Sequence, residues 1–178
     1  MGEQQKALEY YNRSLRLSRD SSYGEAGTLY SIGRVYSQLG ERQKALEYYN
    51  QFLSLRRAID DCNGEAITLS NMALVRRELG NLTEALNDIE ASIKIIEDFR
   101  SQRTAPACDT SELSTSEFGT SELSALDFGT SELSTSYLAT VQDYYEFYID
   151  LLMQLHQANP NPGYDIKASE ARKRASNP

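Results

Sequence analysis

The feature that most limits the fold of this chain is a sequence repeat. GEQQKALEYYNRSLRLSR, from Gly2, recurs almost unchanged as GERQKALEYYNQFLSLRR from Gly40, and a weaker copy, GNLTEALNDIEASIKI, starts at Gly80. The starting glycines are 38 and 40 residues apart. A period in this range indicates a stacked solenoid, in which each unit buries its apolar face only against its neighbours.

Each unit contains the pattern of two helices. Apolar residues at helical spacing predict a first helix over about 25–39, which ends at Gly40, a residue suited to the left-handed conformation that closes helices. A second helix is predicted over about 42–59, before the turn-forming run at 60–64. The same pair recurs at about 65–79 and 82–100. The pattern predicts an all-α fold, with helical repeats over residues 1–102.

Small and aromatic residues recur at matching places in these helices, and their pattern resembles the tetratricopeptide repeat (TPR). Helix axes approach closely only where side chains are small, and a ring then fills the adjoining hole. The residues that carry the resemblance, and that we expect to pack the repeats, are Ala7, Tyr11, Gly33, Tyr36, Ala45, Tyr49, Ala73 and Ala85. The resemblance implies a right-handed superhelical α-solenoid. The long period resembles the variant of kinesin light chains and bacterial signalling proteins. Residues that depart from the pattern are Phe52, Arg76, Ile89 and Ser92.

The C-terminal part carries a second resemblance. The run ATVQDYYEFYIDLLMQLHQANPNPGYD, residues 139–165, resembles the connector between TPR arrays and the caspase-like CHAT domain of bacterial, especially cyanobacterial, proteins. In that family a basic, Ala-rich helix like 167–175 leads into the protease-like domain. The chain also opens inside a repeat, at the turn before a second helix, so both ends are expected to be cut. We expect a helix over about 140–157 to cover the end of the third repeat copy.

A different repeat separates these two parts. TSELSTSEFG, TSELSALDFG and TSELSTSYLA follow one another from Thr110, rich in Ser, Thr and acidic residues. Such a segment buries too little apolar surface to offset its ordering entropy, which predicts a disordered linker. It is either a phosphorylatable tether or docking strip with Leu and Phe anchors, or a tolerated loop expansion. The predicted organisation is repeats at 1–102, linker at 103–136 and a C-terminal helical segment at 137–178.

Charge and composition exclude several classes of partner. The net charge of −8 opposes nucleic-acid binding, which needs a dense basic surface, and only Arg172, Lys173 and Arg174 form a basic cluster. No apolar run is long enough to span a bilayer. The two cysteines, Cys62 and Cys108, indicate no disulfide framework, although the two thiols could pair. The expected location is the cytoplasm.

Residues able to carry chemistry are scarce. His156 is the only histidine, so no site with paired His ligands can form, and a Cys–His pair would need a cysteine from a loop or linker. The tyrosines lie at helical spacing beside Ala and Leu, which favours a core role over base stacking. We therefore expect a non-catalytic protein without metal or cofactor.

Binding is the class of function that remains, and the TPR resemblance implies where the binding site lies. In that family the first helix of each pair lines a concave groove. The corresponding positions are Tyr30, Arg34, Ser37, Gln38, Ser70, Asn71, Leu74 and Arg77. The resemblance gives Asn71 a hydrogen bond to the ligand backbone, and Arg34 and Arg77 are suited to acidic side chains. The alternative is an ordinary solvated helix face.

Two functions follow as hypotheses. The first is a scaffold that binds a protein or peptide partner on its concave surface, with self-association through uncapped repeat ends as a further expectation. The second is a regulatory remnant of a caspase-like CHAT protease that acts beside a separately encoded catalytic domain.

Overall fold

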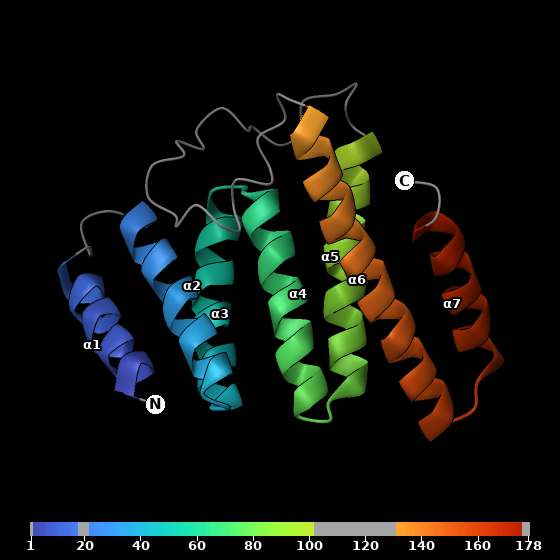
Figure 1. Cartoon of the computed structure of the whole chain (residues 1–178), viewed down its shortest axis with the longest axis horizontal. Coiled ribbons are helices and arrows are strands. Elements are labelled where there is room, and N and C mark those ends of the chain that lie inside the picture. The colour runs from blue at the N-terminus through green and yellow to red at the C-terminus, as the bar shows by residue number, and fades with distance from the viewer. Residues whose placement is uncertain (1, 18–21, 102–130, 176–178) are drawn as a thin grey trace.

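The computed structural model describes residues 2–17, 22–101 and 131–175, and within these ranges the chain forms helices and no strand. The helices are α1 (Gly2–Leu17), α2 (Ser22–Gln38), α3 (Arg42–Ala58), α4 (Cys62–Glu78), α5 (Leu82–Ser101), α6 (Ser131–Ala158) and α7 (Pro162–Ala175). Figure 1 shows them side by side in chain order, from α1 at one end to α7 at the other. The predicted all-α, TPR-like solenoid is confirmed.

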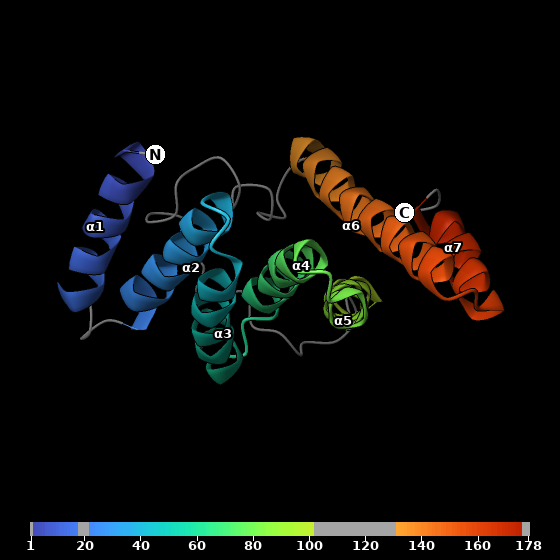
Figure 2. The same cartoon turned by 90° about the horizontal axis from the view of Figure 1, so that it is seen from below.

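The helices pack as pairs that repeat along the array. α2 pairs with α3, α4 with α5, and α6 with α7, and each pair contacts the next through α3–α4 and α5–α6. Figure 2 shows the same succession from below. The C-terminal helices therefore continue the array as a further pair, although 29 residues, 102–130, separate them from α5 in the sequence.

The short turns between helices share one backbone geometry. Gly40 and Gly80 have φ of +77° and +81°, in the left-handed region, as the sequence predicts. The following residue then donates its N–H to a carbonyl five residues back, Glu41 to Tyr36 and Asn81 to Arg76, both at 2.9 Å. Asp60 takes the same place between α3 and α4, with φ of +54°. These turns hold successive helices antiparallel.

Small residues allow the close helix contacts that the repeat needs. A Cβ atom at Gly33 would lie 2.8 Å from two ring carbons of Tyr49, so α2 meets α3 at a point where only glycine fits. Ala45, Ala73 and Ala85 are fully buried. Ala7 and Tyr11 on α1, by contrast, are only half-buried.

One helix contact has different chemistry in consecutive units. In the α2–α3 pair the rings of Tyr36 and Tyr48 stack, with centroids 5.5 Å apart. Forty residues later, Arg76 and Asp88 occupy these two places in the α4–α5 pair and form an ion pair. Arg76, which departs from the TPR pattern, is thus matched by a complementary change on the facing helix.

The end of the third repeat copy is covered as expected. Ile89 and Ile93 of α5 belong to one core cluster with Tyr145 and Leu152 of α6 and with Ala168 of α7. Leu151 and Leu152 are fully buried. Burial of apolar side chains therefore joins α6 and α7 to the repeats that precede residues 102–130.

The C-terminal helices start earlier than the sequence predicts. α6 begins at Ser131 instead of about residue 140, and α7 begins at Pro162 instead of Lys167. Asn161 accepts a hydrogen bond from Gly163 N (2.9 Å), which places Pro162 in the first turn, where its missing N–H costs nothing. Most of the predicted linker lies outside the described residues, so its disorder stays a prediction.

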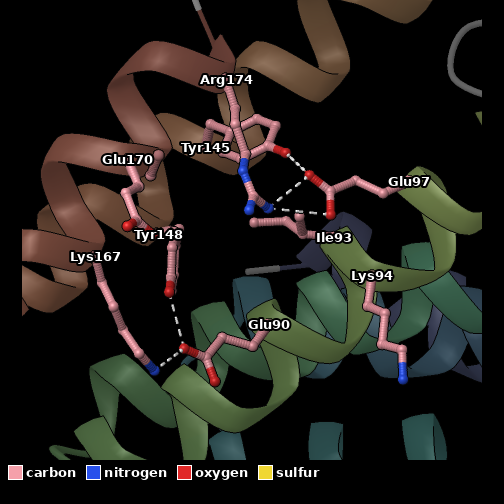
Figure 3. Close-up of a pocket in the computed structure, with 10 residues that line it drawn as sticks. Glu90, Ile93, Lys94, Glu97, Tyr145, Tyr148, Lys167, Glu170 and Arg174 are labelled. Carbon is pink, nitrogen blue, oxygen red and sulfur yellow. Dashed lines mark hydrogen bonds and ion pairs between the residues drawn. The ribbon is translucent and has the colours of Figure 1, made fainter.

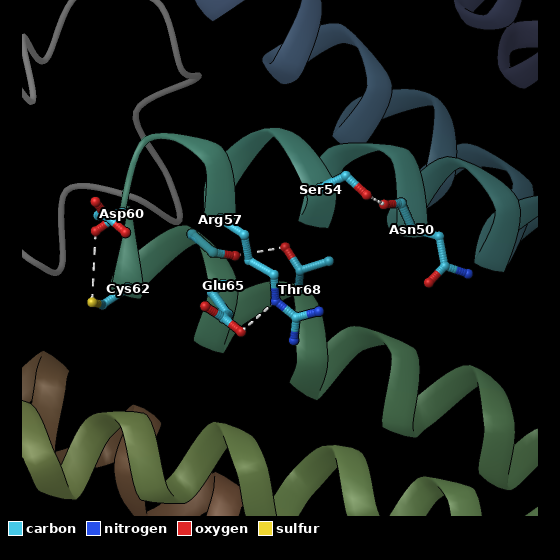
Figure 4. Close-up of polar contacts among 8 residues, drawn as sticks. Asn50, Ser54, Arg57, Asp60, Cys62, Glu65 and Thr68 are labelled. Carbon is cyan, nitrogen blue, oxygen red and sulfur yellow. Dashed lines mark hydrogen bonds and ion pairs between the residues drawn. The ribbon is translucent and has the colours of Figure 1, made fainter.

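The α3–α4 junction holds several polar contacts (Figure 4). Arg57 Nε donates to Glu65 Oε1 at 2.7 Å, and Thr68 Oγ1 donates to Gly64 O at 2.6 Å. Cys62 is disulfide-bonded, a possibility that the sequence left open although it indicates no disulfide framework. The other cysteine of the chain, Cys108, lies outside the described residues.

Candidate binding face

The residues predicted to bind a partner come from α2 and α4, and a hydrogen bond joins the two helices at this place. Asn71 Nδ2 donates to the hydroxyl of Tyr30 at 3.1 Å, between residues 41 positions apart. We call the surface formed around this contact by Tyr30, Arg34, Ser37, Gln38, Asn71, Leu74 and Arg77 the α2/α4 face. Two successive units thus contribute to one surface.

Asn71 has less capacity for a ligand than the resemblance implies. Its amide nitrogen donates to Tyr30 and also to the carbonyl of Ile67, at 2.9 Å, one turn earlier in α4. These bonds use both amide hydrogens. Only the carbonyl oxygen of Asn71 then remains to contact a partner, and it can accept but not donate.

The two arginines of the α2/α4 face lie against aromatic rings. The guanidinium carbon of Arg34 is 6.0 Å from the ring centre of Tyr30, and that of Arg77 is 4.5 Å from the ring centre of Phe147 on α6. Cations are attracted to the face of an aromatic ring, so each ring favours the observed place of its guanidinium. Both arginines therefore bring positive charge to the α2/α4 face.

An apolar side chain lies exposed on the same face. Leu74, one turn before Arg77 on α4, is 41% exposed, although leucine is usually buried in a helix array. Gln38 at the end of α2 is exposed, and Ser37 is half-buried. The face thus offers an apolar contact together with cations and amide groups.

Ser70 is the predicted residue that the structure places differently. It is only 6% exposed, and its hydroxyl donates to the carbonyl of Ile67 at 2.8 Å. Tyr144 of α6 lies close to Ser70. A side chain buried to this extent is not open to a partner, so Ser70 is not part of the α2/α4 face.

The contribution of α6 to this region does not follow from the sequence. Arg77 lies over the ring of Phe147, and Tyr144 lies close to Ser70, although both α6 residues come after residues 102–130. The sequence shows the aromatic run of α6. It does not show which of these aromatic residues lie against α4, because this depends on how α6 packs across the end of the third copy.

A second cluster of polar groups lies between α5, α6 and α7 (Figure 3). It lines a cavity of about 210 Å³. Glu90 Oε1 accepts hydrogen bonds from Tyr148 and Lys167, both at 2.8 Å. Glu97 accepts from Tyr145 and, at 3.1 and 3.3 Å, from Arg174. Each of these two α5 carboxylates therefore binds one tyrosine of α6 and one cation of α7. This arrangement indicates that the cluster fixes α6 and α7 against α5.

The environment of this cluster suppresses tyrosine ionisation. Burial, together with the hydrogen bond to Glu97, raises the pKa of Tyr145 to about 12. Burial and the hydrogen bond to Glu90 likewise raise the pKa of Tyr148 well above the usual value of a tyrosine. Both hydroxyls donate to a carboxylate, and the phenolate form would place a second negative charge beside it.

This shift predicts a loss of stability in alkali. A tyrosine in the unfolded chain ionises with a pKa of about 10. The stability that Tyr145 gives the folded protein is therefore fully present below about pH 10 and is lost as the pH rises through about 12. We expect the melting temperature of Tyr145→Phe to fall less over this range than that of the parent. As a control, Tyr10→Phe changes a ring that is 74% exposed and should follow the parent curve. Equal slopes for the parent and Tyr145→Phe would contradict this role.

The remaining residues considered for chemistry do not form a further site among the described residues. His156 lies at the α6–α7 turn, where Asn161 N donates to its Nδ1 at 3.3 Å and Asp165 lies 3.6 Å from Nε2. Within residues 2–17, 22–101 and 131–175, no three His, Cys, Asp or Glu side chains lie close enough to hold a metal ion. None of the helices in these ranges combines the length and apolar character needed to cross a membrane.

Comparisons with known proteins agree with this architecture. Residues 1–58 match the family model of the tetratricopeptide repeat. A comparison with curated protein sequences gives no match. Among solved structures, BtubC (BKLC) from P. vanneervenii is similar, with a TM-score of 0.62 at 14% identity over 99% of this chain.

A second similar structure is a kinesin-light-chain-type protein of Podosopora anserina with nearly identical TPR-like repeats. It has a TM-score of 0.49 and 15% identity, covering 98% of this chain and 82% of its own. The present chain spans 59% of the BtubC chain. Together with the family match over residues 1–58, the BtubC likeness shows that the seven described helices have the fold of a TPR-type solenoid.

Proposed function

We propose that this protein is a non-catalytic scaffold that binds an acidic segment of a partner protein on the α2/α4 face. The observation that carries the proposal is the exposure of Leu74, at 41%, on the same surface as two ring-supported arginines. TPR-type repeats, which residues 1–58 match, supply the general setting of protein interaction.

The chemistry of the α2/α4 face defines the ligand class. Arg34 and Arg77 favour carboxylates, because a guanidinium edge forms paired, charge-assisted hydrogen bonds with them. Leu74 favours an apolar anchor between the acidic residues, since covering it removes apolar surface from water. Asn71 adds an acceptor for one backbone N–H of the bound segment. The ligand is therefore an acidic segment with a Leu- or Phe-like anchor.

The CHAT-type resemblance of residues 139–165 suggests a setting for such a scaffold. In the arrangement it implies, the face would deliver partners to a caspase-like domain on the same or a separate chain. The matched family model ends at residue 58, so this link rests on the resemblance alone.

A peptide array tests the proposed ligand class. Acidic peptides with a Leu or Phe anchor are compared with versions in which Lys replaces Asp and Glu, and the best binder is titrated against the full chain. Removing charged hydrogen bonds costs about 1.5–3 kcal/mol each, so Arg34→Ala with Arg77→Ala should weaken binding by about a hundredfold or more. The effect should shrink as salt rises, because exposed charges are screened.

The matched control removes two exposed arginines elsewhere. Arg13→Ala with Arg16→Ala on α1 makes the same change in net charge and should leave binding nearly unchanged. Asn71→Ala should weaken binding less than the α2/α4 double variant. If the two double variants lose affinity equally, attraction is governed by net charge and the α2/α4 face is not the binding surface.

A further inference from the structure

The arginines of α3 and α4 pair with carboxylates, with one exception. Four of them form ion pairs at 2.7–3.4 Å, namely Arg42, Arg56, Arg57 and Arg76. The exception is Arg77, whose guanidinium contacts the ring of Phe147 but no carboxylate of the described residues. Leu74, one turn earlier on α4, is 41% exposed. This part of the α2/α4 face therefore fits a segment that carries both a carboxylate and an apolar side chain.

The chain contains such a segment. Residues 110–129 consist of two copies of the ten-residue repeat, TSELSTSEFG and TSELSALDFG. They include four acidic residues and no Lys or Arg, and each copy has leucine and phenylalanine. We call residues 110–129 the acidic repeat. Its charge is opposite to that of Arg34 and Arg77, and its apolar side chains match the exposed Leu74.

A disulfide gives the acidic repeat a short path to this face. Cys62, the first residue of α4, is disulfide-bonded, and the only other cysteine of the sequence is Cys108. A bond within the chain therefore ties Cys108, two residues before the acidic repeat, to the start of α4.

The lengths of the two segments agree. Leu74 and Arg77 follow Cys62 by 12 and 15 residues, which is about 18 and 22 Å along a helix. An extended chain advances about 3.3 Å per residue, so residues 110–119 can reach from about 7 to 36 Å beyond Cys108. The first copy of the acidic repeat is thus long enough to pass both Leu74 and Arg77.

We propose that the acidic repeat occupies the α2/α4 face of its own chain, with an apolar side chain against Leu74 and a carboxylate at Arg77. The inference rests on the proposed function, because it takes the same face, and it adds regulation: a partner must displace the acidic repeat. A ligand on a short tether has an effective concentration of about millimolar, so even a weak contact of this kind competes with a partner.

The first copy of the acidic repeat provides the probe. A labelled peptide of residues 110–119 is titrated into the full-length parent and into a neutralised variant, and binding is followed by fluorescence anisotropy. The neutralised variant carries Glu112→Gln, Glu117→Gln, Glu122→Gln and Asp127→Asn. We expect saturable binding to this variant and binding to the parent that is weaker by about tenfold or more, because the parent's own repeat occupies the face.

Matched variants separate occupancy from net charge. The control neutralises four exposed carboxylates elsewhere, at Glu9, Glu47, Asp150 and Glu170, and should bind the probe as weakly as the parent. Adding Arg34→Ala and Arg77→Ala to the neutralised variant should remove most of the binding. Cys62→Ser with Cys108→Ser should strengthen binding relative to the parent, since a longer tether lowers the effective concentration.

Several results would overturn the inference: a probe that does not bind the neutralised variant, equal affinities of the parent and the neutralised variant, or an affinity that the cysteine substitutions leave unchanged. In each case the proposed function still stands if the array peptides bind the α2/α4 face, so the two failures are distinguishable. A parent dimer that becomes a monomer on neutralisation would also overturn the inference, because the acidic repeat would then bind a second copy. Sedimentation measures this directly.

Discussion

We expect Asp88→Ala to lower the free energy of unfolding by about 3 kcal/mol, since it leaves the charge of Arg76 without its main partner in a largely buried place. Asp88 is 8% exposed, and burial raises the pKa of its carboxyl even though Arg76 acts in the opposite direction. Glu84, 3.4 Å from Arg76 Nε, is more exposed and replaces Asp88 only in part. Urea unfolding gives the comparison directly.

The preceding unit indicates how the loss can be recovered. There Tyr36 stacks on Tyr48, and the Lys44 ammonium lies 5.2 Å from the Tyr36 ring centre. Positions 76, 84 and 88 correspond to these three residues. The triple variant Arg76→Tyr, Glu84→Lys, Asp88→Tyr should therefore unfold within about 1 kcal/mol of the parent, because a packed neutral pair substitutes well for a buried ion pair.

The control for this experiment is an exposed aspartate. Asp150→Ala on α6 removes the same group from an exposed position and should change stability by less than about 0.5 kcal/mol. If Asp88→Ala is no worse than this control, Arg76 and Asp88 are not coupled across the α4–α5 contact.

A second large effect is expected at the junction with the C-terminal helices. Leu152→Ala should destabilise the protein by about 3 kcal/mol, since Leu152 is fully buried in the cluster shared by α5, α6 and α7. Neighbouring units of a solenoid stabilise one another, so melting of α4 and α5 should shift together with that of α6. Circular dichroism follows the total loss, and hydrogen exchange resolves it by helix.

Leu74→Ala is the matched control for that change. It is the same substitution in another helix of the array, but Leu74 is 41% exposed and its loss leaves no cavity. We expect nearly unchanged stability, together with weaker binding of acidic peptides. Equal destabilisation by the two variants would show that α6 is not packed more tightly than the solvent-exposed side of α4.

The repeat period made most of the fold predictable. Helix pairs separated by glycine turns follow from local sequence, because Gly40 and Gly80 supply the left-handed residue that closes each first helix. The start of α6 was not predictable in the same way. Residues 131–136 continue the ten-residue repeat and have its polar composition, although the helix already begins at Ser131.

The features of the candidate site that depend on a single repeat unit were predictable from the sequence, whereas contacts between units were not. The exposed position of Leu74 follows from the helical spacing of α4. The bond from Asn71 to Tyr30 joins residues of two units, and the contact of Arg77 with Phe147 joins α4 to α6. Such contacts depend on the angle between neighbouring pairs, which no local pattern encodes. The exchange of Tyr36 and Tyr48 for Arg76 and Asp88 did leave a signal, a simultaneous change at two positions of consecutive units.

The most direct test of the proposed function maps where an acidic peptide binds. Backbone amide shifts of the full, isotope-labelled chain are recorded during titration with the best binder from the peptide array. We expect the largest shifts to cluster on the α2/α4 face, at Arg34, Gln38, Leu74 and Arg77, and α1 and α7 to change little. Shifts that concentrate on α3, α5 or α7 while the α2/α4 face stays unchanged would contradict it.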